Sequence, residues 1–129
     1  MSLRVYAYEN CDTCRKALKF LAAKKVVAEV IPIRQQPPSV AELRAMLGYV
    51  GDDLRRLFNT AGQDYRALDM KTRLPKLAVE EALQLLASNG NLVKRPFALT
   101  AKSGVVGFRE EEWEQLVSTG LTRGSGAGR

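Results

Sequence analysis

The stretch of the chain that decides the fold runs from Leu3 to Ile33 and reads LRVYAYENCDTCRKALKFLAAKKVVAEVIPI. Its start alternates and is rich in β-forming residues, which predicts a strand over Leu3–Tyr8. Apolar residues then recur with helical spacing, which predicts a helix from about Asp12 to Lys24. A second β-branched run predicts a strand over Val26–Ile33 that ends at Pro32 or lies at a sheet edge. We expect the two strands of this β-α-β unit to be parallel.

Farther along the chain, the pattern changes to helices and then back to short strands. Ser39 and Glu42 form a predicted capping box, and we expect the helix that they begin to stop at Gly48. Further helices are expected around 52–58, 78–89 and 110–117, a loop or broken turn over 59–68, and strands over 97–100 and 105–108.

This order of elements predicts one α/β domain with a thioredoxin-like fold of the glutaredoxin type, spanning residues 1–118. Its four-stranded mixed sheet would carry a helical insertion, at about 39–89, between the β-α-β and β-β-α halves. Residues 119–129 are rich in Gly, Ser, Thr and Arg, which predicts a disordered tail.

The composition excludes several classes of function. No apolar run approaches the ~18 residues of a membrane span, and no secretory signal is visible, so we expect a cytoplasmic protein. The chain has no histidine, which excludes catalytic triads with a histidine base. With only Cys11 and Cys14, one chain cannot complete a Cys/His zinc site, and we expect neither a metal nor a bound cofactor.

The net charge of +6 favours anionic partners such as oxyanions, phosphates or acidic peptides. The 20 Lys and Arg residues are scattered, without a basic run or a basic patch interleaved with aromatic residues. This distribution does not favour nucleic-acid binding.

The motif Cys11-Asp12-Thr13-Cys14 lies where the first predicted strand turns into the first helix, which is typical of a thioredoxin-like redox motif. The N–H groups and dipole at a helix start favour a thiolate at Cys11, and Arg15 adds positive charge. Cys14 lies one turn later, within reach of a disulfide. Because it also falls on the apolar stripe, Cys14 is either a resolving thiol or a packing residue. We expect Asn10, Thr13 and Arg15 to contact the substrate.

A second candidate site is Lys94-Arg95-Pro96, directly before a predicted strand. Thioredoxin-type folds place a cis-proline facing the redox cysteine at this point, so we predict a cis bond at Pro96. Arg95 would then lie close to Cys11, where its planar five-donor fork suits an oxyanion. The alternative is that Arg95 is an ordinary surface cation.

Several motifs together resemble the arsenate reductase (ArsC/Spx/YffB) family, in order and spacing, over about Arg4–Val117. They are CDTCRKA from Cys11, LFNT from Leu57, GQDYR from Gly62, KRP from Lys94 and GFREE from Gly107. The resemblance implies a thioredoxin-like fold with a helical insertion and one nucleophilic cysteine. It also implies an arginine trio around the oxyanion, with glutathione and glutaredoxin as the reductant.

Carried over residue by residue, Cys11 matches the family nucleophile and Arg95 the arginine of the Arg-Pro motif, next to Pro96. Arg109 is the approximate match for a late arginine, whereas the third arginine falls at Asn59 and is missing. Many arsenate reductases also lack a cysteine at the position of Cys14. Both departures indicate the Spx-like and YffB-like branch.

Two functional hypotheses follow. The first is a thiol-dependent oxidoreductase in which Cys11 attacks arsenate or a disulfide, with glutathione as co-substrate and glutaredoxin as partner. Arg95, Arg109 and the N–H groups of the Cys11–Cys14 turn would stabilise the anion. The second is an Spx-like transcriptional regulator that binds RNA polymerase without turnover, switched by a Cys11–Cys14 disulfide.

Overall fold

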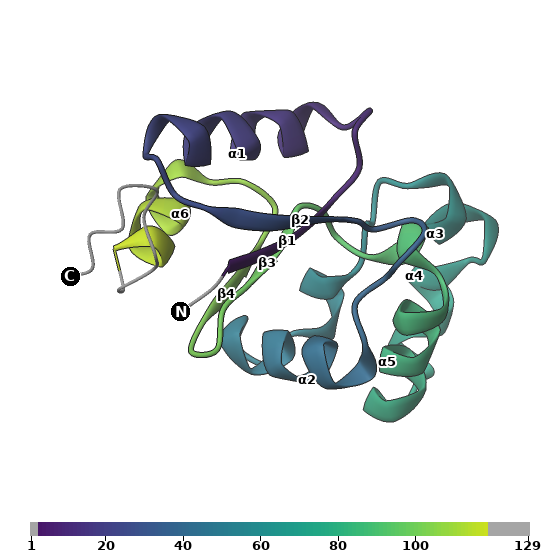
Figure 1. Ribbon diagram of the computed structural model, residues 1–129. Coiled ribbons are helices and arrows are strands. Elements are labelled where there is room, and N and C mark those ends of the chain that lie inside the picture. The colour runs from purple at the N-terminus through teal and green to yellow at the C-terminus, as the bar shows by residue number, and fades with distance from the viewer. Residues whose placement is uncertain (1–2, 119–129) are drawn as a thin grey trace.

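Four strands form one mixed sheet at the centre of the computed structural model, which describes residues 3–118 (Figure 1). They lie in the order β2-β1-β3-β4 and span Leu3–Ala7 (β1), Ala28–Pro32 (β2), Phe97–Leu99 (β3) and Gly104–Val106 (β4). β1 pairs with β2 in parallel and with β3 antiparallel, and β3 and β4 form a hairpin. The predicted α/β, thioredoxin-like architecture is confirmed.

The β-α-β unit closes through α1, Asp12–Ala23, much as predicted. The strand expected from Val26 begins instead at Ala28, because Lys25 has a left-handed backbone (φ 59°) and turns the chain first. β2 ends at Pro32 and lies at the sheet edge, where a residue without an N–H breaks no ladder.

Helices cover both faces of the sheet, and alternation along β1 separates the two layers. Leu3, Val5 and Ala7 pack against α1 and α6, which spans Glu110–Val117. Tyr6 faces the other way, into a core shared with α2 (Val40–Tyr49) and α5 (Val79–Ser88). Figure 1 shows α1 above the sheet and α2 and α5 below it. Each layer therefore has its own hydrophobic core.

The capping box that begins α2 forms as predicted. The Ser39 hydroxyl accepts from the Glu42 N–H at 3.1 Å, and the Glu42 carboxylate accepts from the Ser39 N–H at 2.9 Å. The expectation that Gly48 stops this helix is wrong, because α2 continues to Tyr49. The left-handed glycine that follows the helix is Gly51, with φ 76°.

The loop expected over 59–68 contains a short helix, α3, at Gln63–Ala67. Its Tyr65 packs on Phe58, with ring centroids 6.1 Å apart. The helix expected around 52–58 is a 3₁₀ helix, η1, at Leu54–Leu57. Helices of three to five residues offer few positions for a periodic pattern, which is why α3 was not predicted. The others of this kind are α4 (Met70–Arg73), η2 (Leu74–Lys76) and η3 (Gly90–Leu92).

The last strand differs from its prediction in both bounds. It begins at Gly104 and ends at Val106 rather than at Phe108, because Gly107 takes φ 72° and leaves the ladder. The tail expected to be disordered, 119–129, lies outside the described residues. Within residues 3–118, every helix is too short or too polar to cross a membrane.

Candidate active site

Cys11 is the N-cap residue of α1. Its backbone is extended (φ −114°, ψ 117°), and its Sγ accepts a hydrogen bond from the Cys14 N–H at 3.3 Å. The Cys11 N–H donates to the Tyr8 carbonyl at 3.1 Å, which closes the turn between β1 and α1. The positive end of the α1 dipole therefore acts on the Cys11 sulfur.

Both cysteines are free thiols, but their surroundings differ. Burial raises the pKa of Cys14 to about 12, since this side chain packs in the core between α1 and α6 and is 1% exposed. Partial burial also acts to raise the pKa of Cys11. Hydrogen bonding from Cys14 and the nearby charge of Arg95 outweigh that burial and lower the pKa of Cys11 below its ordinary value. Cys11 therefore ionises first.

The segment before β3 brings Arg95 to the thiol. Its backbone is tied to the helical segment, since the Lys94 N–H donates to the Leu57 carbonyl at 2.8 Å. The Asn59 N–H likewise donates to the Leu92 carbonyl at 2.7 Å. The Arg95–Pro96 peptide bond is cis, as predicted, and Pro96 is buried directly before β3.

A cavity of about 220 Å³ holds Arg95 and Asn59 together with Tyr8 and Arg34. The guanidinium carbons of Arg34 and Arg95 lie over the Tyr8 ring, 4.8 and 5.0 Å from its centroid. Arg34 also donates to the Tyr8 hydroxyl at 2.8 Å. A hydrogen bond from Asn10, followed by the charges of the two arginines, lowers the pKa of Tyr8. Asn10 thus acts on Tyr8 in this structure.

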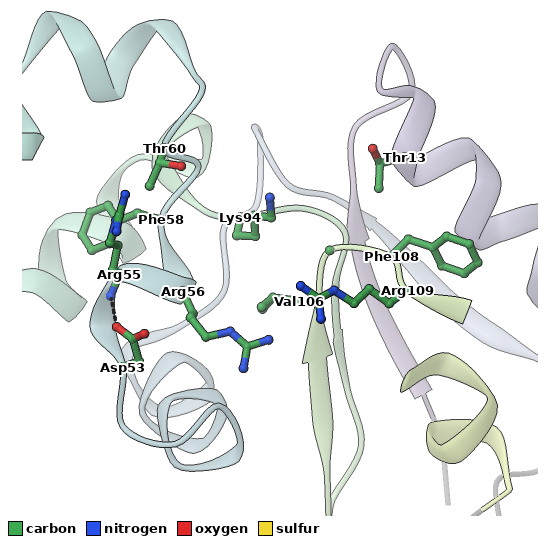
Figure 2. Close-up of a pocket in the computed structure, with 11 residues that line it drawn as sticks. Thr13, Asp53, Arg55, Arg56, Phe58, Thr60, Lys94, Val106, Phe108 and Arg109 are labelled. Carbon is green, nitrogen blue, oxygen red and sulfur yellow. Dashed lines mark hydrogen bonds between the residues drawn. The ribbon is translucent and has the colours of Figure 1, made fainter. Parts of the chain in front are cut away.

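A larger cavity, of about 510 Å³, adjoins the start of α1, where Thr13 lines it (Figure 2). Arg109 lines this larger cavity rather than the one that holds Arg95. Arg15 lines neither cavity, and its guanidinium lies 3.2 Å from the Asp12 carboxylate. The structure therefore divides the predicted oxyanion-binding residues between two cavities.

Sequence reasoning missed Tyr8 and Arg34 as site residues, although a signal for both was present. Tyr8 follows β1 directly, and Arg34 follows β2 by two residues. The carboxyl ends of two parallel strands meet at one edge of a sheet, where ligands commonly bind. The larger cavity also contains Lys94, Arg55 and Arg56, and for the two arginines of η1 no local pattern indicates a site.

A family model described as the ArsC family matches residues 6–116. The chain belongs to the ArsC family. It is similar to the uncharacterized protein YusI of Bacillus subtilis (strain 168), with 44% identity over 115 residues, 89% of this chain and 98% of YusI. It is also similar to the global transcriptional regulator Spx of Enterococcus faecalis (strain ATCC 700802 / V583), with 29% identity over 110 residues, 85% of this chain and 82% of Spx.

Among solved structures, a possible arsenate reductase from Streptococcus mutans UA159 superposes with a TM-score of 0.80 at 38% identity. The match covers 87% of this ArsC-family chain and 97% of that protein. Relatives of the chain thus include proteins described as a reductase and as a regulator, so family membership alone does not choose between the two functions.

The chemistry that this ArsC-family site offers is that of thiols and cations. An ionisable thiol, a second thiol one helical turn away and an adjacent guanidinium suit nucleophilic attack on sulfur or on an oxyanion. Among residues 3–118, no three His, Cys, Asp or Glu side chains gather as metal ligands would.

Proposed function

We propose that this ArsC-family protein is a thiol-dependent oxidoreductase in which Cys11 is the nucleophile. The observation that carries the proposal is the lowered pKa of Cys11 at the N-cap of α1, beside Arg95. The thiolate is the attacking species, so a lowered pKa increases the fraction of Cys11 in the reactive form at a given pH. Arg95 and the N–H groups of the first turn of α1 stabilise the negative charge that develops on the substrate.

With a disulfide substrate, the Cys11 thiolate attacks one sulfur, forms a mixed disulfide and releases the other half as a thiolate. Cys14 then loses its proton to solvent, attacks the Cys11 sulfur and expels the second half. The substrate gains two electrons, and the protein holds a Cys11–Cys14 disulfide. Glutathione, directly or through glutaredoxin, is the proposed reductant that restores both thiols. Attack by glutathione on the mixed disulfide is the route that leaves Cys14 unused.

The division of the arginines favours a disulfide or a glutathione-linked substrate over arsenate. Asn59 stands beside Arg95 where the family resemblance implies an arginine, and Arg109 lines a different cavity. Arg34 shares the cavity of Arg95, but it already donates to the Tyr8 hydroxyl. A small tetrahedral oxyanion on Cys11 would therefore meet fewer free bidentate donors than the family pattern provides.

The test is a coupled assay with the purified protein, glutathione, glutaredoxin, glutathione reductase and NADPH. One arm contains arsenate and the other a small disulfide, and the Cys11→Ser variant is the blank in both. We expect NADPH oxidation above this blank in the disulfide arm. Turnover with arsenate alone would make the protein an arsenate reductase, and no turnover in either arm would reject the enzyme.

The second candidate is redox-controlled binding to RNA polymerase. It is favoured by the similarity to the regulator Spx over 85% of the chain and by the free Cys11 and Cys14 thiols one turn apart. A disulfide between them would alter the start of α1 and so change affinity for a partner. Capture of RNA polymerase by only one redox form, without turnover in the coupled assay, would support this candidate.

A further inference from the structure

The larger cavity carries four cationic side chains that the proposed attack by Cys11 does not use. Arg55 and Arg56 come from η1, Lys94 from the segment before β3, and Arg109 from the N-cap of α6. Figure 2 shows Arg56 and Arg109 reaching toward one another from opposite walls, with Lys94 above them in this view. Three separate parts of the chain thus converge with the same sign of charge.

These charges are poorly neutralised by the protein. In the part of the chain that the structure describes, Arg55, Lys94 and Arg109 form no ion pair with an acidic side chain. The Arg56 guanidinium lies 3.9 Å from the Glu112 carboxylate, and the two side chains are 43% and 34% exposed. Ion pairs this open to solvent contribute little, so Glu112 neutralises Arg56 only weakly. A concave wall with unbalanced positive charge attracts and concentrates anions.

The remaining walls show what kind of anion fits. Phe58 and Val106 expose only 1% and 7% of their surface, and the Phe108 ring packs on Phe20 and Trp113, so the cations dominate the wall that a ligand would meet. Asp53 also lines the cavity, but its carboxylate accepts the Arg55 N–H at 3.1 Å and caps η1. The volume of about 510 Å³ falls within the range of about 300–1,000 Å³ that small organic ligands occupy.

The position of the cavity connects it to the reactive thiol. Thr13, which lines the cavity, lies two residues after Cys11 in the first turn of α1. Lys94 directly precedes Arg95, the residue whose charge acts on Cys11. Cys11 itself does not line the cavity, so a molecule seated among the cations would have to extend past Thr13 to bring a sulfur to the thiol.

We propose that this cavity binds the anionic body of a low-molecular-weight disulfide, one that bears two or more carboxylates or phosphates, and presents its sulfur to Cys11. This inference rests on the proposed function and names its substrate class. The Cys11 thiolate forms the new S–S bond with the bound half, and the S–S bond of the substrate breaks. The other half leaves with the electron pair as a thiolate, so charge and electrons balance.

The first experiment compares three disulfides of similar length but different charge. They are dithiodipropionate (a dianion), dithiodiethanol (neutral) and cystamine (a dication). Rates of thiol release by the reduced protein are divided by the rates of the same disulfides with free mercaptoethanol, which removes their intrinsic reactivity. We expect the dianion to exceed the neutral disulfide by about tenfold at low salt, with an advantage that shrinks as salt screens the charges.

Two variants locate this preference. Arg56→Gln and Lys94→Gln should each lower the dianion-to-neutral ratio by about threefold or more. The matched control is Lys102→Gln, which removes the same charge from the turn between β3 and β4. That turn lies at the amino end of β1, since Leu99 pairs with Arg4, whereas Cys11 follows its carboxyl end. An unchanged ratio in both test variants overturns the inference while the proposed function stands.

A binding measurement separates the two proposals. Thiodipropionate, a thioether, carries the same two carboxylates but cannot exchange with a thiol. Calorimetric titration should show binding to the wild type and to Lys102→Gln, weakened about threefold or more in Arg56→Gln and Lys94→Gln. This pattern in a protein that exchanges no disulfide would refute the proposed function and keep the site. No binding, or equal binding by all four proteins, overturns the site.

Discussion

The two helical layers that cover the sheet contribute different parts of the candidate site. The layer of α1 and α6 contributes both thiols, with Cys14 buried in its core and Cys11 at its edge. The layer on the opposite face contributes cations and neutral polar groups, among them Arg55 and Arg56 on η1 and Asn59 after it. The reactive atom and the two arginines of η1 thus come from opposite sides of the sheet, whereas Arg109, at the N-cap of α6, comes from the layer of the thiols.

Because the thiols and the cations of η1 lie in different layers, substitutions in one layer can test its role without changing the other. The α1 layer sets which sulfur ionises, through a helix start and through burial. The opposite layer contacts the α1 layer through the segment 93–96, which leads into β3. Val93 of this segment forms an antiparallel bridge with Phe58, directly after η1. Changes in the first layer should alter whether the chemistry occurs, and changes in the second should alter how fast and with what stability.

The largest effect is expected from Cys11→Ser, which should reduce disulfide exchange to the level of the blank. A serine hydroxyl does not ionise near neutral pH and forms no mixed disulfide. Mass spectrometry of the protein after incubation with a small disulfide measures the adduct directly. Cys14→Ser is the matched control and should still form the mixed disulfide. If Cys11→Ser formed the adduct at the wild-type rate, Cys11 would not be the nucleophile.

Alkylation should separate the two thiols of the same layer. With its pKa raised to about 12, Cys14 stays protonated at pH 7, so iodoacetamide should label Cys11 at least about a hundredfold faster. Because the pKa of Cys11 is lowered, the midpoint of its labelling rate against pH should lie below that of an ordinary thiol, which is about pH 8.5.

The same titration tests Arg95 as one cause of that lowered pKa. Arg95→Gln should shift the labelling profile of Cys11 to higher pH, because it removes a positive charge that favours the thiolate. Peptide mapping across a pH series measures both sites at once. Faster labelling of Cys14 at pH 7 would reverse the roles of the two cysteines.

The close contact between η3 and the residue after β2 should make stability sensitive to a side chain at Gly90. A Cβ at this position would lie 1.9 Å from the Ile33 carbonyl oxygen, and the backbone would have to move. We expect Gly90→Ala to lower the free energy of unfolding by about 1–3 kcal/mol. Urea unfolding followed by circular dichroism measures the change, and wild-type stability would show that the two segments are not in contact.

Arg95→Lys should reduce kcat/KM for exchange by more than about tenfold, which is about 1.4 kcal/mol of transition-state stabilisation. Lysine keeps the charge but loses the planar fork and its bidentate geometry. Arg44→Lys, on the exposed face of α2 and paired with Glu80, is the matched control. Unchanged kinetics in Arg95→Lys would mean that charge alone is needed.

The smallest effect is expected from Gly48→Ala in α2, which should raise the free energy of unfolding by about 0.5–1 kcal/mol. Gly48 lies inside the helix, and an added Cβ meets nothing within 4 Å. Gly48→Ala is the matched counterpart of Gly90→Ala: the added methyl group meets open space at Gly48 and backbone at Gly90. Thermal or urea unfolding measures the gain, and a loss of stability would mean that this face of α2 is covered.

The α1 layer could be predicted in some detail. Its signals are short in range: alternation along β1, the apolar stripe of α1 and a cysteine at a helix start. The capping box of Ser39 with Glu42 is equally local, and it formed. Gly48 misled the prediction because a glycine ends a helix only where its backbone is left-handed, and here Gly51 has that conformation.

The sequence by itself determined the β-α-β order and the position of Cys11 at the start of α1, because each depends on neighbours within a turn or a motif. The cis bond at Pro96 was predicted from the fold type that this order indicated. Only the tertiary structure decided which cations accompany the thiol. Arg34, Arg56 and Arg109 are far apart in the chain, and no periodic pattern links them. Their places depend on how short helices pack and where strand ends meet, since packing acts between residues remote in sequence.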